Sequence, residues 1–212
     1  LSVEARRMLD ENGFQETKIL ASNDLDEFVV DSLQLQQARI DAWGIGTKLV
    51  TAYDQPALDG VYKMGAIRDP GKDWQYKIKI AEQSNKLTTP GIQQVRRYRQ
   101  NGYYAADMIY DVQQGFEIPC TMVDPFDITR QRHFESEANW EDLLQPAFRQ
   151  GKAVQELPSL NSIRERVQSQ LNGFHSAVLR TVNPHEYPVG MERGLFNLRT
   201  KLALNVRSQS RH

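Results

Sequence analysis

The sequence predicts a mixed fold in which parallel α/β units come first and antiparallel strands with two further helices follow. Over about the first fifty residues, helical periodicity alternates with short apolar runs, which is typical of α/β units in an open sheet or a closed barrel. From residue 61 onward, strand-like runs flank the turn signals Asp69-Pro70-Gly71 and Asn101-Gly102, which favour antiparallel hairpins. A length of 212 residues allows one large domain or two small ones.

The first part of the chain is predicted to contain two helices and two strands. Residues 2–10 read as an amphipathic helix that Ser2 can cap. Residues 18–21 and 40–43 read as short apolar strands, and residues 25–37 between them repeat apolar side chains at helical spacing. Because the first helix calls for a strand before it, we expect this chain to be the later portion of a longer polypeptide.

The second part is predicted to contain strands at residues 61–68, 74–81, 95–100 and 103–111. Asn101-Gly102 joins the last two, since this dipeptide tolerates the positive φ angles of a type I′ turn. Residues 159–171 form a helix with Ser159 or Asn161 as its cap, and residues 191–206 form a terminal amphipathic helix.

Composition narrows the function classes. The 26 basic residues nearly balance the 27 acidic ones, so the overall charge gives no reason to expect a nucleic acid or an anionic membrane as partner. The single Cys120 rules out an internal disulfide and a cysteine-based zinc cluster, and the histidines have no metal-ligand spacing. No apolar run is long enough to span a bilayer. We expect a cytoplasmic protein without a metal site of its own.

The most informative pattern is a pair of small, polar strand ends. Ser22 and Asn23 follow the first strand, and Gly44, Gly46 and Thr47 follow the second. Because the carboxyl ends of parallel strands meet at one edge of a sheet, these residues are expected to form one site. Glycine-spaced turns let backbone N–H groups approach a phosphate closely, and a threonine hydroxyl adds a donor.

A purely structural interpretation of the same residues stays open. The glycines can simply permit close packing in a tight turn. Ser22, Asn23 and Asp24 all suit the N-cap of the helix that starts near Leu25. Asp26 is then expected in the first helical turn, where the helix dipole favours a carboxylate.

Four stretches of the chain resemble the second half of nicotinate phosphoribosyltransferase, in the order that this family has them. They are KILASNDLD at residues 18–26, WGIGTKLVTAYDQPAL at 43–58, KLTTPG at 86–91 and NPHEYPVG at 183–190. The resemblance implies the later part of an incomplete type II phosphoribosyltransferase α/β barrel, with adjoining strands, in residues 1–92. It implies an α+β C-terminal domain in residues 93–212.

The resemblance also implies an activity. Members of the family form nicotinate mononucleotide and pyrophosphate from nicotinate and phosphoribosyl pyrophosphate, with ATP hydrolysis, in NAD salvage. They use Mg²⁺ and ATP and assemble as homodimers. The family's phosphorylated histidine and much of its nicotinate pocket lie upstream of the segment represented here. We therefore expect no catalytic residue in this chain, the N-terminal half of the same enzyme as its partner, and no turnover by the chain alone.

Site residues follow from the resemblance in two groups. Ser22 and Asn23 are expected to contact the ribose, and the turn of Gly44, Gly46 and Thr47 its 5′-phosphate. Contacts to pyrophosphate or a nucleotide are expected from the basic residues Lys86, Lys77, Lys79 and Arg97. The competing interpretation of these four is a solvated loop or an exposed strand face.

The sequence leaves two alternative functions open. One is a nicotinamide- or quinolinate-specific relative, because residues upstream set the choice of base. The other is a non-catalytic scaffold built on a barrel remnant. Binding of phosphoribosyl pyrophosphate, and its loss on Gly46→Val, separates a scaffold from an enzyme.

Overall fold

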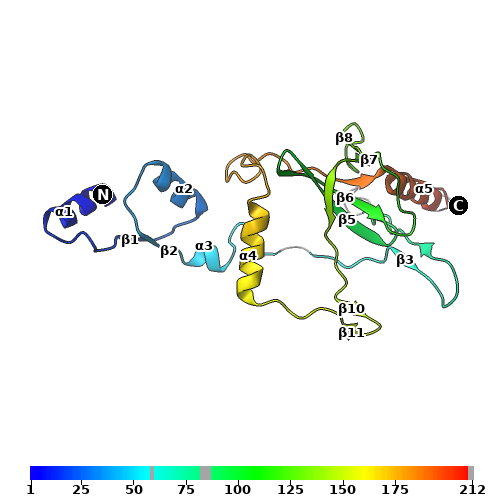
Figure 1. Cartoon of the computed structure of the whole chain (residues 1–212), viewed down its shortest axis with the longest axis horizontal. Coiled ribbons are helices and arrows are strands. Elements are labelled where there is room, and N and C mark those ends of the chain that lie inside the picture. The colour runs from blue at the N-terminus through cyan, green and yellow to red at the C-terminus, as the bar shows by residue number, and fades with distance from the viewer. Residues whose placement is uncertain (58–59, 82–86, 210–212) are drawn as a thin grey trace. The chain divides into compact units, whose positions relative to one another are not determined.

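The computed structural model describes residues 1–57, 60–81 and 87–209. The chain divides into two compact units, Leu1–Val61 and Tyr62–His212 (Figure 1). The domain boundary predicted after residue 92 falls inside the second unit and stays a prediction. Within the described ranges, no helix combines the length and the apolar character needed to cross a membrane.

The first unit has the predicted alternation of helices and strands. Its two short strands, β1 (Leu20–Ser22) and β2 (Ala42–Gly44), pair in parallel. Helix α2 (Glu27–Leu35) lies between them in sequence, which is the connection that parallel strands require. Helix α1 (Ser2–Glu11) precedes β1, and the single turn of α3 (Thr47–Val50) follows β2.

The predicted cap of α1 is wrong. The N-cap position is Leu1, and no side chain accepts a hydrogen bond from the start of this helix. The Ser2 hydroxyl instead accepts a hydrogen bond from the main-chain N–H of Arg39, 3.1 Å away. Sequence spacing cannot reveal such a partner, because it lies 37 residues along the chain.

The second unit is built on a six-stranded mixed sheet. Its strand order is β8-β7-β12-β6-β5-β9, with β12 parallel to β6 and antiparallel to β7. The strands are β5 (Gln93–Gln100), β6 (Tyr103–Asp111), β7 (Cys120–Val123), β8 (Gln131–Phe134), β9 (Asn139–Asp142) and β12 (Val189–Glu192). Helix α5 (Arg193–Gln209) contacts β7 and β12. The buried core of the sheet comprises Tyr98, Ala106, Met108, Cys120, Met122 and Phe134.

The predicted hairpin at Asn101-Gly102 is confirmed. Asn101 has φ of 51° and Gly102 has φ of 83°, as a type I′ turn demands, and Gln100 faces Tyr103 across the ladder. The hairpin at the Asp69-Pro70-Gly71 turn is also present. Its strands β3 (Ala66–Ile67) and β4 (Gln75–Tyr76) are much shorter than predicted.

The remaining elements are two helices and a small hairpin. Strands β10 (Phe148–Arg149) and β11 (Lys152–Ala153) form the hairpin. Helix α4 (Leu160–Leu171) has Ser159 as its N-cap, which confirms one of the two predicted caps. Helix α5 begins two residues later than predicted, because Met191 belongs to β12.

Candidate functional site

The carboxyl ends of β1 and β2 meet at one edge, as predicted. Ser22 lies opposite Gly44 in the parallel register, and the Ser22 hydroxyl donates to the Gly44 carbonyl oxygen at 3.2 Å. A Cβ atom added at Gly44 would meet the Ser22 Oγ at 3.0 Å. Gly44 therefore has a packing role at this edge, because any side chain would have to displace Ser22 to keep the two strand ends this close.

Gly46 and Thr47 occupy a different environment. Both are exposed, and a Cβ atom added at Gly46 would find nothing within 4 Å. Neither main-chain N–H donates a hydrogen bond to another described residue, and no side chain caps the turn. The turn after β2 thus presents two unpaired backbone donors and a threonine hydroxyl to open space, an arrangement suited to binding an anion.

The loop after β1 also differs from the capping interpretation. Asn23 and Asp24 have φ angles of 92° and 46°, so neither continues into the helix. Helix α2 begins at Glu27, and its cap is Asp26, whose Oδ1 accepts from the Val29 N–H at 2.8 Å. Both the expected cap at residues 22–24 and the expected first-turn position of Asp26 are wrong. The Asn23 side chain is left exposed beside the strand edge.

One contact at this edge was not predicted. The Lys48 ammonium forms an ion pair with Asp26 Oδ2 at 2.8 Å. The hydrogen bond from Lys48, helped by the Val29 N–H, lowers the pKa of Asp26, and the same bond raises the pKa of Lys48. The sequence does carry one signal for this pair. Asp26 and Lys48 are 22 residues apart, the same separation as Ser22 and Gly44, which lie opposite each other in the parallel register.

The predicted basic contacts lie in the second unit. Lys77 and Lys79 are exposed while Ile78 between them is half-buried, so the two lysines share a face as expected. The Lys77 ammonium donates to Gln75 Oε1 at 3.2 Å. Lys86 lies outside the described residues.

Arg97 is engaged within the sheet. Its Nε and Nη2 donate to the two carboxylate oxygens of Asp107 at 2.8 and 2.7 Å, and both side chains are only 12% exposed. The Tyr187 hydroxyl donates to the same carboxylate at 2.9 Å. The hydrogen bonds to Asp107 raise the pKa of Arg97 despite the opposing effect of burial. A role of Arg97 in binding pyrophosphate stays a prediction.

The donor set for a metal is incomplete in the part of the chain that the structure describes. There, no three His, Cys, Asp or Glu side chains come together as a group that could hold a metal ion. Proteins bind Mg²⁺ in phosphate sites through one or two carboxylates together with the substrate phosphates. At the described residues, a Mg²⁺ ion would therefore depend on substrate phosphates and water for most of its ligands.

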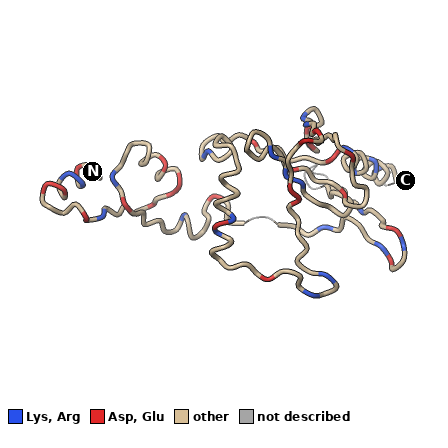
Figure 2. The backbone as a smooth tube through the Cα atoms, viewed as in Figure 1, with Lys and Arg blue, Asp and Glu red and all other residues tan. Residues whose placement is uncertain are grey.

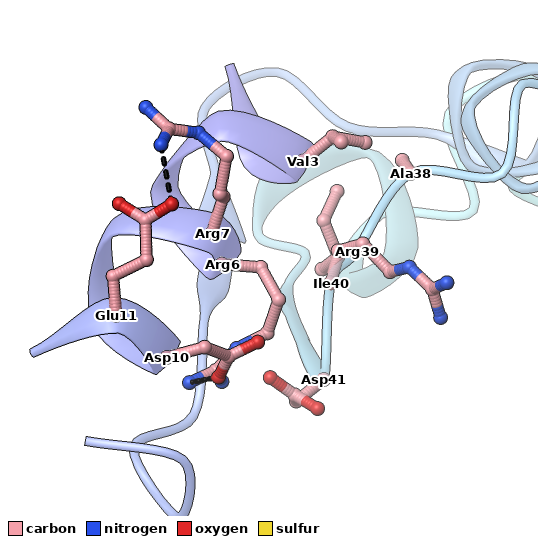
Figure 3. A pocket seen from close by; sticks show the side chains of 9 residues that line it. All are labelled: Val3, Arg6, Arg7, Asp10, Glu11, Ala38, Arg39, Ile40 and Asp41. Carbon is pink, nitrogen blue, oxygen red and sulfur yellow. Dashed lines mark hydrogen bonds and ion pairs between the residues drawn. The ribbon is translucent and has the colours of Figure 1, made fainter. Parts of the chain in front are cut away.

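A cavity of about 660 Å³ lies at the opposite, amino end of the same two strands (Figure 3). Its charged side chains are mostly paired with one another, with Arg6 on Asp10 and Arg7 on Glu11. Asp41 in its wall accepts a hydrogen bond from the Ile19 N–H at 2.7 Å. The Asp41–Ile19 hydrogen bond joins the residues just before the two strands, whereas the carboxyl edge keeps unpaired donors.

Charge is mixed along the whole chain. Figure 2 shows basic and acidic residues alternating rather than gathered in long stretches of one sign. This agrees with the formal net charge of -1.

Comparison with known proteins identifies the class. Residues 92–199, half of the chain, match the family model described as the nicotinate phosphoribosyltransferase C-terminal domain. The six-stranded mixed sheet lies within the matched residues, which places the chain in the phosphoribosyltransferase class of proteins. The chain is a member of the nicotinate phosphoribosyltransferase family.

Relatives extend the similarity to both units. Nicotinate phosphoribosyltransferase of Bacillus subtilis is 38% identical over 99% of this chain and 43% of its own length. The Dictyostelium discoideum enzyme of the same name is 32% identical over 87% of this chain and 32% of its own length. The chain therefore spans less than half the length of these relatives.

A solved structure supports the fold. The crystal structure of human nicotinic acid phosphoribosyltransferase matches 95% of this chain and 36% of its own, with a TM-score of 0.62. Sequence identity is 22%, so this likeness concerns the fold alone. It agrees with the mixed α/β architecture predicted from the sequence.

Proposed function

We propose that this chain is the part of a nicotinate phosphoribosyltransferase that holds the phosphoribosyl group. The complete enzyme would form nicotinate mononucleotide and pyrophosphate from nicotinate and phosphoribosyl pyrophosphate, coupled to ATP hydrolysis, in NAD salvage. Family membership supports the reaction class. The observation that carries the local assignment is the exposed turn at Gly46 and Thr47, whose N–H groups have no partner among the described residues.

The reaction needs both ends of its substrate held still. The bond from the anomeric carbon to the pyrophosphate oxygen breaks, and a bond from that carbon to the nicotinate ring nitrogen forms. Positive charge builds on the sugar while the leaving pyrophosphate takes the electron pair. Fixing the 5′-phosphate and the ribose hydroxyls orients the anomeric carbon before reaction, which removes entropy from the barrier.

The residues take separate roles in this proposal. The main-chain amides of Gly46 and Thr47, with the Thr47 hydroxyl, bind the 5′-phosphate. Asn23 donates to and accepts from the ribose hydroxyls, and the Ser22 oxygen, whose proton is donated to the Gly44 carbonyl, accepts from one of them. Gly44 lets the two strand ends approach. The candidates for contacts to the pyrophosphate are Lys77, Lys79, Lys86 and Arg97.

Further properties are proposed from the resemblance alone. They are the use of Mg²⁺ and ATP, assembly as a homodimer, a cytoplasmic location, and completion of the active site by the N-terminal half of the enzyme. We propose that the 212-residue chain alone forms no nicotinate mononucleotide. Chromatographic detection of that product from nicotinate, phosphoribosyl pyrophosphate and ATP would contradict this.

Isothermal titration of the chain with phosphoribosyl pyrophosphate tests the local assignment. We expect binding by the wild type and its loss in Gly46→Val, because the new side chain occupies the open space before the turn. Gly60→Val is the matched control, since a Cβ atom there also meets nothing within 4 Å and Gly60 belongs to neither of the two strand ends. Equal behaviour of both variants, or no binding by the wild type, would favour a scaffold.

A further inference from the structure

Asp26 uses its two carboxylate oxygens for two different tasks. Oδ1 accepts the Val29 N–H and so caps α2, while Oδ2 accepts the Lys48 ammonium, both at 2.8 Å. The Asp26 side chain is 13% exposed and that of Lys48 37%, so the ion pair is partly shielded from water. A shielded ion pair is screened by salt less than a fully exposed one.

This ion pair is the second of two ties between the same segments. The Ser22 hydroxyl already joins the end of β1 to the Gly44 carbonyl. The ion pair joins the far end of the β1 loop to the helix that follows the β2 turn. Between the two ties lie the residues assigned to the ligand, Asn23 on the loop and Gly46 and Thr47 on the turn.

Lys48 is not placed as a free cation for a phosphate. Its ammonium contacts the Asp26 carboxylate and lies 5.2 Å from the centroid of the Tyr53 ring. The carboxylate neutralises its charge where it stands, so a phosphate nearby would meet a pair with no net charge. The position of Lys48 therefore favours a role in holding the two backbone segments together rather than in contacting the ligand.

We propose that Asp26 and Lys48 are positioning residues, which fix the Asn23 loop against the Gly46–Thr47 turn so that ribose and phosphate are gripped together. The inference rests on the proposed function. A site of this kind depends on the distance between its two halves, because small displacements of the donors weaken several hydrogen bonds at once. Breaking the ion pair frees the loop at one end.

Titration calorimetry with phosphoribosyl pyrophosphate on the whole chain tests the pair. Lys48→Met removes the ammonium, and Asp26→Asn removes the charge while its amide oxygen can still cap α2. We expect each variant to raise Kd about tenfold, within the range of coupling between contacting residues. The double variant should bind no more weakly than either single variant, and Lys48→Arg should restore binding to within about twofold.

Lys72→Met is the matched control, since it breaks an exposed ion pair with Asp69 in the second unit and should leave Kd unchanged. Losses that add in the double variant would show that Lys48 acts on the ligand directly and would overturn the inference. The inference would also be overturned if the wild type binds phosphoribosyl pyrophosphate and the variants bind it equally well. A wild type that does not bind defeats the proposed function itself. Should Lys48→Met fail to fold, Asp26→Asn and Lys48→Arg decide the question.

Discussion

The two glycines at the strand edge, Gly44 and Gly46, differ in the space around them. At Gly44 an added Cβ atom would lie 3.0 Å from the Ser22 Oγ, so a side chain there would push Ser22 aside. At Gly46 the space is open, so packing gives no reason for a glycine there. The sequence shows the two glycines as one motif, and only the surroundings separate a packing role from a ligand-facing one.

Arg97 uses its guanidinium for an ion pair with Asp107 inside the sheet. Removing one partner of a buried pair leaves an uncompensated charge, so Arg97→Met or Asp107→Leu alone should cost roughly 3–5 kcal/mol of unfolding free energy. The double variant should recover most of this loss, because no charge is left unpaired. Urea unfolding of the four chains measures both effects. Losses that simply add would contradict the ion pair as described.

The same variants bear on the predicted pyrophosphate contact. If Arg97 reaches the ligand, the double variant should bind phosphoribosyl pyrophosphate more weakly even when its stability is restored. If the guanidinium serves only the sheet, stability and binding should recover together. Calorimetric titration of the refolded double variant distinguishes these results.

Among the secondary-structure elements, the sequence predicted turns more reliably than the residues that cap the helices. The Asn101-Gly102 turn could be found because its dihedral angles are a property of those two residues. Ser159 could be found as a cap because its partner is three residues away. Ser2 was misassigned because its partner, Arg39, is brought close only by the fold. Asp26 was misassigned although its capping partner, Val29, is three residues away, because residues 22–24 are cap-forming types too.

Strand lengths were missed for a related reason. Residues 61–68 and 74–81 have suitable side chains for strands, yet only two residues of each form a ladder. A strand exists only where a partner strand offers hydrogen bonds. Glycine spacing predicted the turn at Gly44–Thr47, whereas the Asp26–Lys48 ion pair beside it could be found only in the structure.

The hairpin turn makes its own prediction. Gly102 has φ of 83°, where an L side chain is strained, so Gly102→Ala should cost about 1–2 kcal/mol of unfolding free energy. The hairpin joins two central strands of the sheet, so the whole second unit should unfold at lower urea. An unchanged midpoint of unfolding would contradict the assigned turn. Gly60→Ala provides a control at another glycine where an added Cβ atom would meet nothing within 4 Å.

For the whole molecule, burial differs between the two units. Among the described residues of Leu1–Val61, the one buried apolar side chain is Leu25, whereas the second unit has a continuous buried core. A segment of about sixty residues is marginal even when it buries its apolar surface well. The first unit is therefore expected to depend on further contacts for its stability.

Separate expression of the units tests this difference. Residues 62–209 should unfold in one cooperative transition, because the six-stranded sheet and its core lie within that segment. Residues 1–61 should show no cooperative transition. Thermal melts followed by circular dichroism give the answer. A cooperative first unit, or an unfolded second one, would contradict the assignment of stability to the sheet.

The most direct test of the account is an amide chemical-shift titration of the isotope-labelled chain with phosphoribosyl pyrophosphate. Donation from the main chain to the 5′-phosphate predicts that the Gly46 and Thr47 amide signals shift most, in a saturable way, with smaller changes at Ser22 and Asn23. Ribose 5-phosphate should move the same signals. Saturable shifts elsewhere in the chain, with Gly46 and Thr47 unchanged, would contradict the account.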